Sequence, residues 1–219
     1  MRQNPTPEER VKNAALFLCL AEQLAQDGVI GDRLKVQKCT FLVTLDQFEK
    51  RLKGFNLTFF RYKMGPLSRQ VYDIVDMLKA AGLVDSRGTR YYLTEQGLSF
   101  ALQFCAELWA DPQNKPFHEQ FVAVGNQFGT MSSSGVKDYV YSLTVTPIGG
   151  QEQAIRDMPE GLDITQVLDP DEATREIVIP QGWLETLAIM ASPESRRGLE
   201  QAERELAAGK TLSHAEVWV

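Results

Sequence analysis

The sequence contains few of the residues on which enzymes most often depend. It has two histidines, His118 and His214, and three cysteines in 219 residues. The two histidines lie far apart, and neither has a cysteine or another histidine at the spacing of metal ligands. Nucleotide-binding loops, dinucleotide fingerprints and the glycine-flanked serine of hydrolases are also missing. We therefore expect a binding protein rather than an enzyme, with no catalytic residues, no metal site and no cofactor.

Long apolar runs are missing as well. No stretch of about 18 apolar residues occurs, so no membrane span is expected. The first ten residues carry charges but no apolar core of a signal peptide. Cys19, Cys39 and Cys105 are widely spaced and odd in number, which favours buried thiols in a reducing compartment. The sequence therefore predicts a cytoplasmic protein without membrane contact.

The charges that are present divide unevenly between the two halves of the chain. Residues 1–104 carry 15 basic and 11 acidic side chains, whereas residues 105–219 carry 8 basic and 18 acidic ones. A mildly basic front and an acidic back favour nucleic acid as a partner for the first half and a basic partner for the second. An acidic surface that only maintains solubility is the alternative for the back half.

Helix signals dominate the first 80 residues. Thr6, Pro7 and Glu9 form a capping box with proline at the first helical position. A second helix should begin near Asp32, followed by a short strand at residues 57–62 and a turn at Gly65-Pro66. A third helix should begin after Ser68, because apolar residues recur there at helical spacing.

The clearest pattern is a hairpin after this third helix. Residues 83–85 and 90–93 read as two short strands, and Gly88 supplies the backbone freedom that the tight turn between them needs. A further helix starts at Thr94. A helix, a tight hairpin and another helix start are the usual end of a winged helix-turn-helix. The predicted fold class is therefore α+β, mainly helical with a small β hairpin, a winged-helix-like N-terminal domain and a C-terminal tail made of a short strand and helices.

The remaining pattern predicts four successive parts of the chain. Glycine and proline are frequent between residues 144 and 163, which indicates a linker. The predicted parts are a winged-helix-like domain at 1–110, accessory helices at 111–145, a linker at 146–172 and a tail at 173–219.

The tail ends in a helix with a narrow apolar face among many charges. Such a helix is not stable alone in water, so it must pack on its own domain or on a partner. The tail residues that we predict to bind a partner are apolar or small: Trp183, Leu187, Leu199, Ala202, Leu206 and Trp218.

A second candidate surface is the hairpin. Arg87 and Arg90 flank its turn, where cations could contact the phosphates of DNA, and Arg69 lies nearby in the sequence. A solvated basic surface is the alternative.

A further pattern combines a Lys-x-Gln-Lys helix segment, then an aromatic-rich strand, a Gly-Pro pair and a further helix. The residues that carry it are Lys35, Gln37, Lys38, Tyr62, Gly65, Pro66 and Tyr72. With this pattern, residues 10–105 resemble the Panacea domain of bacterial and phage antitoxins. The resemblance implies a winged-helix-like module in an antitoxin whose partner is a protein toxin.

In the tail, an Ile177-Val178-Ile179-Pro180 segment precedes the helices. From this segment onward, over about 45 residues, the tail is similar to the C-terminal part of Phd/YefM-type antitoxins, which wraps and neutralises the toxin. Together the two resemblances imply a type II antitoxin that binds a toxin, with operator DNA and a second copy of the chain as further partners. The alternatives are a stand-alone winged-helix transcription regulator and an adaptor that delivers a partner to a protease.

Overall fold

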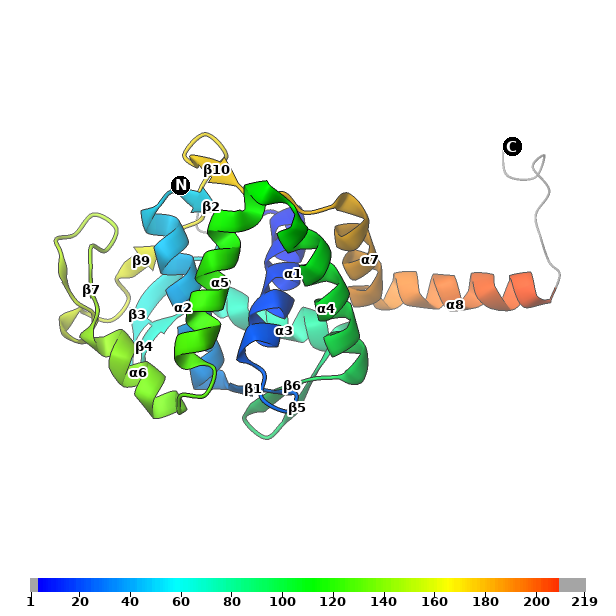
Figure 1. Cartoon of the computed structure of the whole chain (residues 1–219), viewed down its shortest axis with the longest axis horizontal. Helices are drawn as coiled ribbons and strands as arrows, with labels where there is room; N and C mark the ends of the chain where they lie inside the picture. The colour runs from blue at the N-terminus through cyan, green and yellow to red at the C-terminus, as the bar shows by residue number, and fades with distance from the viewer. Residues whose placement is uncertain (1–3, 209–219) are drawn as a thin grey trace.

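The computed structural model describes residues 4–208, except the side chains of Arg196, Leu199 and Glu200. Most of this part of the chain is helical (Figure 1). The α-helices are α1 (Pro7–Leu24), α2 (Arg33–Glu49), α3 (Arg69–Ala80), α4 (Glu95–Ala110), α5 (Lys115–Phe128), α6 (Ser133–Ser142), α7 (Gln181–Ala191) and α8 (Pro193–Ala207). Two short 3₁₀ turns are η1 (Pro112–Asn114) and η2 (Ile155–Asp157).

Short strands form small sheets around these helices. The strands are β1 (Val29–Asp32), β2 (Leu52–Lys53), β3 (Phe59–Tyr62), β4 (Gly65–Leu67), β5 (Val84–Arg87), β6 (Arg90–Leu93), β7 (Thr144–Val145), β8 (Gln153–Ala154), β9 (Asp163–Thr165) and β10 (Arg175–Glu176). The fold is α+β, as the sequence predicts. Within residues 4–208, no helix is both long and apolar enough to span a membrane.

Helix α1 is the centre of the molecule. Thr6 caps it, and the predicted capping box with Glu9 is present in both directions. Every side chain from Ala14 to Ala21 is at most 1% exposed, because α1 contacts α3, α4, α5 and α7 on different sides. A helix that is apolar all round is a buried helix, which explains why this stretch has the longest apolar run in the chain.

The hairpin predicted after α3 is present and gains a third strand. β5 and β6 pair antiparallel from Val84 with Leu93 to Arg87 with Arg90, and Gly88 turns between them with φ +61°. β1 then pairs with the other edge of β6, so that the strand order is β1-β6-β5. The sequence did not predict β1, because its four residues include a glycine and have no alternating pattern.

The Gly65-Pro66 pair does not form the predicted turn. Tyr62 pairs with Gly65, so the turn consists of Lys63 and Met64, and Gly65-Pro66 begins strand β4. Gly65 enters the strand with φ +90°, a conformation that other residues adopt only with strain.

The prediction of a linker at residues 146–172 is wrong. β9 pairs with β3, so this segment completes a sheet with the N-terminal part of the chain. The side-chain amide of Asn56 binds both backbone groups of Leu168 at 2.7 and 3.0 Å. Apolar side chains of the segment are buried as well: Ile155, Met158, Ile164, Val167 and Leu168. Its glycines and prolines mark turns between short packed elements, so 1–110 and 146–172 are not separate units.

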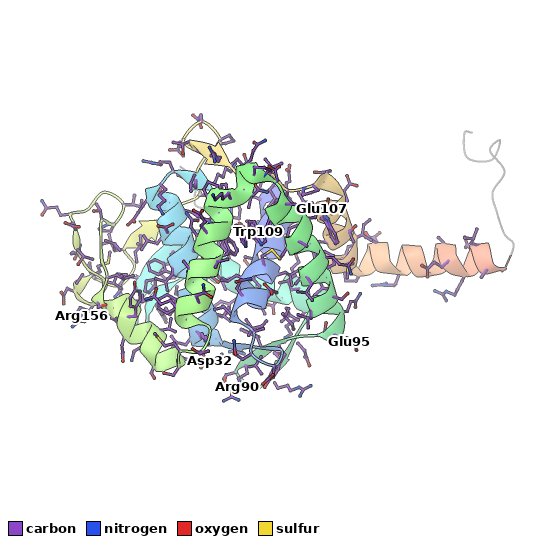
Figure 2. All side chains as sticks on the ribbon, in the orientation of Figure 1. Asp32, Arg90, Glu95, Glu107, Trp109 and Arg156 are labelled. Atoms are coloured by element: carbon purple, nitrogen blue, oxygen red, sulfur yellow. A yellow bond between two sulfur atoms is a disulfide. The ribbon has the colours of Figure 1, made fainter. Side chains whose placement is uncertain are left out.

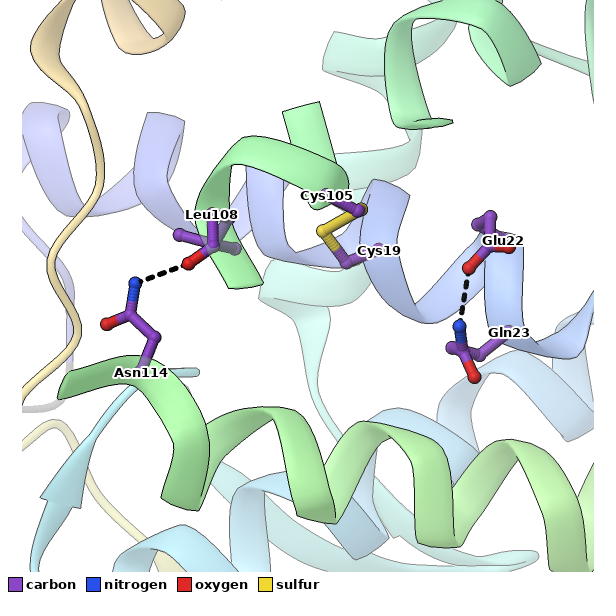
Figure 3. Close-up of a disulfide and its surroundings, with 6 residues drawn as sticks. All are labelled: Cys19, Glu22, Gln23, Cys105, Leu108 and Asn114. Carbon is purple, nitrogen blue, oxygen red and sulfur yellow. Dashed lines mark hydrogen bonds between the residues drawn. A yellow bond between two sulfur atoms is a disulfide. The ribbon is translucent and has the colours of Figure 1, made fainter. Parts of the chain in front are cut away.

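Two of the three cysteines also differ from the prediction of free thiols. Cys19 of α1 and Cys105 of α4 form a disulfide (Figure 3). Cys39 is the free thiol, and burial raises its pKa to about 12. Spacing along the sequence could not reveal the pair, because the packing of α1 on α4 brings together residues that are 86 positions apart.

Candidate functional site

The first helix of the tail packs on the body of the molecule. On α7, Leu187 is fully buried and Leu184 is 4% exposed, and the helix contacts α1 and α3. The ring of Trp183 lies edge-on to Phe100 and Phe104 of α4, with centroids 5.1 and 5.7 Å apart. Trp183 and Leu187, predicted to bind a partner, therefore dock α7 in cis.

A polar contact completes this docking. The indole Nε1 of Trp183 donates a 2.7 Å hydrogen bond to Oε2 of Glu107 on α4. Upstream, the strand that leads to α7 is also fixed, because β10 pairs in parallel with β2 and Ile177 is buried. The predicted tail at 173–219 is thus divided, and its part up to residue 191 belongs to the body.

Helix α8 behaves differently from α7. It extends away from the rest of the molecule (Figure 1), and its described side chains are all exposed. Leu206 is 67% exposed, and Ala202 is exposed one turn earlier. The side chain of Leu199 and the whole of Trp218 lie outside the described residues, so their predicted role stays a prediction.

Ser192 is the joint between the two helices. It ends α7 and caps α8, where its Oγ accepts a hydrogen bond from the backbone N–H of Ser195. Pro193 follows at the first helical position of α8, where its missing N–H is tolerated. The direction of α8 is therefore set by one capped junction.

Most residues of the Lys-x-Gln-Lys and Gly-Pro motifs are internal. The amide of Gln37 accepts from the backbone N–H of Ser68 and donates to its carbonyl, at 3.0 and 2.9 Å. The ammonium of Lys38 donates to the carbonyl of Pro66 at 2.7 Å, and that of Lys35 donates to the carbonyl of Gly129 at 2.6 Å. These three side chains hold α2 against β4, the start of α3 and the end of α5.

Ser68, the residue before α3, does not cap that helix with its side chain. Helix α3 begins at Arg69, but the hydroxyl of Ser68 makes no capping bond. Its backbone groups are instead held by Gln37. Of the remaining motif residues, Gly65 and Pro66 are buried, Tyr72 is half-buried and Tyr62 is 42% exposed.

Next to Lys38 lies a charged residue that the sequence did not single out. Arg61 of β3 is 8% exposed, donates from Nε to the carbonyl of Ile155 and lies over the ring of Tyr141. Burial, together with the charge of Arg61, lowers the pKa of Lys38 to about 7. The signal was the alternation in β3, because Arg61 is two residues after the fully buried Phe59 and therefore faces the same side.

The candidate DNA-contacting residues do not form one surface. Arg87 and Arg90 are exposed opposite each other at the end of the hairpin, and Figure 2 shows Arg90 at the lower edge of the molecule. Arg69 begins α3, whose 12 residues span about 18 Å before the hairpin starts. Arg69 lines a pocket with Thr58 and Asp163, and neither Arg87 nor Arg90 lines that pocket.

Comparisons with models of known protein families, with curated proteins and with solved structures found no match. What the chain binds is therefore inferred below from its own surfaces.

Proposed function

We propose that this protein is an antitoxin that binds a protein toxin through helix α8. The observation that carries the proposal is the contrast between α8 and every other helix. Its described side chains are exposed from Pro193 onward, while α7 before it is anchored by buried Leu184 and Leu187.

Energetics support a partner for α8. A helix of 15 residues is marginal by itself in water, so most of its stability must come from packing. Ala202 and Leu206 lie on the same face as position 199 by helical spacing. Burying such a face contributes about 25 cal/mol per Å² of apolar area, reduced by the ordering of the helix.

The N-terminal part of the chain supports a winged-helix module. The order along the chain is α1, β1, α2, α3, β5 and β6, and the sheet order is β1-β6-β5. In a winged helix, the first strand pairs with the last one in this way, and the hairpin follows the third helix. β3 and β4 are then an insertion between its second and third helices.

DNA binding by this module is the second candidate function, and it would serve a transcription regulator or an autoregulated antitoxin. The exposed Arg87 and Arg90 favour it. Asp73 and Asp76 are exposed on α3, the helix that would enter the major groove, and their charge opposes DNA. We therefore rank toxin binding first.

A capture and rescue experiment tests the proposal. A tagged chain is used to capture proteins from the native host, alongside a chain that ends at Ser192 and the variant Leu206→Glu. Gln201→Glu is the matched control, because it places the same charge on the opposite face of α8. We expect one protein to bind the parent and the control but neither the truncated chain nor Leu206→Glu.

The captured protein is then expressed alone and together with each variant. An antitoxin predicts growth arrest by the captured protein and rescue by the parent and by Gln201→Glu. A captured protein that is harmless overturns the antitoxin function, and one that binds the truncated chain equally well moves the binding surface away from α8. For the second candidate, filter binding should show a salt slope that falls by at most about two units when Arg87 and Arg90 become alanine.

A further inference from the structure

A pair of buried cations without a carboxylate lies beneath the β3–β4 hairpin. Lys38 is 2% exposed and Arg61 is 8% exposed. Each is bound to a backbone carbonyl, that of Pro66 for Lys38 and that of Ile155 for Arg61. A Cβ added at Gly65 would lie 3.4 Å from Nζ of Lys38 and 3.8 Å from the ring of Tyr141, and Arg61 lies over that same ring. The two cations are therefore neighbours, and the charge of Arg61 contributes to the lowered pKa of Lys38.

A buried lysine elsewhere in the molecule shows how such a charge is usually balanced. Lys53 is 5% exposed, and its ammonium lies 3.0 Å from Glu9 and 3.8 Å from Glu176. Across residues 4–208, by contrast, no described carboxylate forms an ion pair with Lys38 or Arg61. Buried charges without a counter-ion destabilise the folded state, so a bound anion would stabilise this pair.

One hydrogen-bond donor of this Lys38–Arg61 pair also has no acceptor among the described residues. Nη1 of Arg61 is buried and has no hydrogen-bond partner among the described residues. The ammonium of Lys38 has three donors and uses one for Pro66. An anion held by both side chains would satisfy these groups and neutralise the charge at the same time.

The surroundings leave this position to an anion. Tyr141 of α6 is half-buried, and its ring lies 5.2 Å from the guanidinium carbon of Arg61. Asp163 of β9 pairs with Phe60 and lines a pocket with it, so it faces the other side of the sheet from Arg61. β4 consists of Gly65, Pro66 and Leu67 and adds no ionisable group.

We propose that Lys38 and Arg61 form a binding site for an oxyanion, a carboxylate or a tetrahedral phosphate-like group, beneath Tyr141. One oxygen of the ion accepts from Nη1 of Arg61 and another accepts from the ammonium of Lys38. Entry of the ion requires Tyr141 to move, which breaks the 2.8 Å bond from its hydroxyl to the carbonyl of Lys63. The site lies at the opposite end of the molecule from α8 (Figure 1), so this proposal does not rest on the proposed toxin-binding role of α8.

Thermal unfolding of the full chain in matched salts tests the site. Sodium sulfate stands for the tetrahedral group and sodium acetate for the carboxylate, each compared with sodium chloride at the same ionic strength. At saturation we expect at least one of the two to raise the Tm by about 3 °C more than chloride does. If only sulfate raises the Tm more than chloride does, the ligand is a tetrahedral ion. If acetate raises the Tm more than chloride does, the ligand is a carboxylate.

Variants separate the site from general salt effects, which matter because sulfate stabilises most proteins. Lys38→Met and Arg61→Met should each lose the excess over chloride. Lys63→Met removes an exposed cation of the same hairpin and should keep it. An excess that persists in both buried-site variants overturns the proposal, as does the absence of any excess in the parent.

A pH series on the unmodified chain gives a second readout that needs no variant. Sulfate and acetate keep their charge between pH 6 and pH 8, whereas Lys38 must be protonated to hold the ion. With a pKa of about 7 for Lys38, the affinity should fall about tenfold from pH 6 to pH 8. An affinity that does not change with pH overturns the role of Lys38 even if the variants fail to fold.

Discussion

Helices α7 and α8 follow each other directly, and yet one is part of the body and the other is not. Ser192 is the single residue between them. Helix α7 carries one charged residue, Glu185, in 11 positions, whereas α8 carries seven in 15. A predominantly apolar helix gains more by packing on α1, α3 and α4 than it loses in entropy, and a predominantly charged helix does not.

The difference between α7 and α8 means that these two helices of the predicted tail do not act as a single binding segment. Trp183 and Leu187 already have partners within the chain, so a toxin that needed them would first have to displace α7. The exposed side chains of α8 need no such displacement. A surface that is free before binding is the better candidate for a first contact.

The largest expected effect tests the docking of α7. Leu187→Asp places a charge in a fully buried position and should lower the free energy of unfolding by about 4 kcal/mol. Ala188→Asp adds the same charge one residue later, at an exposed position of the same helix, and should change it little. Urea unfolding followed by circular dichroism measures both, and similar losses in the two variants would contradict the docked orientation of α7.

The second prediction concerns two of the helices against which α7 packs. Cys19 and Cys105 join α1 to α4, so reducing the disulfide should lower the free energy of unfolding by about 3 kcal/mol, mainly by freeing the unfolded chain. The measurement is urea unfolding with and without a reducing agent. Cys39→Ala is the control that keeps the disulfide and should respond to the reducing agent as the parent does.

Thiol titration decides whether this disulfide forms in solution. The denatured, unreduced chain should show one free thiol, that of Cys39. Three free thiols under these conditions would contradict the bond between α1 and α4.

Local signals in the sequence predicted the helices and the hairpin well. The capping box at Thr6 and the apolar residues Val71, Ile74, Val75 and Leu78 are properties of a few neighbouring residues, and the structure confirms them. Strands β1 and β9 are three or four residues long, and they exist because distant partners pair with them. Segments that short carry no period of their own, so residues 146–172 looked like a linker.

The residues of the candidate sites also differ in whether the sequence alone predicts their exposure or burial. Exposure of the arginines beside Gly88 follows from a local turn and could be predicted. The alternation in β3 indicates that Arg61 faces the same side as the buried Phe59. The segments that cover Arg61 and Lys38 are α6 and η2, which lie far along the chain, so the local pattern could not predict that these two cations are buried together. The exposure of α8 could be expected from its charges, but the docking of α7 depends on Phe100, Phe104 and Glu107.

A smaller effect isolates the polar part of the α7 anchor. Trp183→Phe keeps an aromatic ring against α4 and removes the hydrogen bond to Glu107, so it should lower the free energy of unfolding by about 1 kcal/mol. Glu107 is exposed, and water can replace the lost donor. A double-mutant cycle with Glu107→Ala measures the pair, and a coupling energy near zero would contradict this contact.

Changes in α8 should have the smallest effect on stability, because α8 differs most from α7 in how its side chains pack. Leu206→Asp, and a chain that ends at Ser192, should each change the free energy of unfolding of the body by less than about 0.5 kcal/mol, because the described side chains of α8 are exposed. Hydrogen exchange should be fast at the backbone amides of α8 and slow in α7, where Leu184 and Leu187 are buried. Slow exchange in α8, or a loss of more than about 1 kcal/mol in either variant, would mean that α8 packs on its own body, and it would then have to undock before it could hold a toxin.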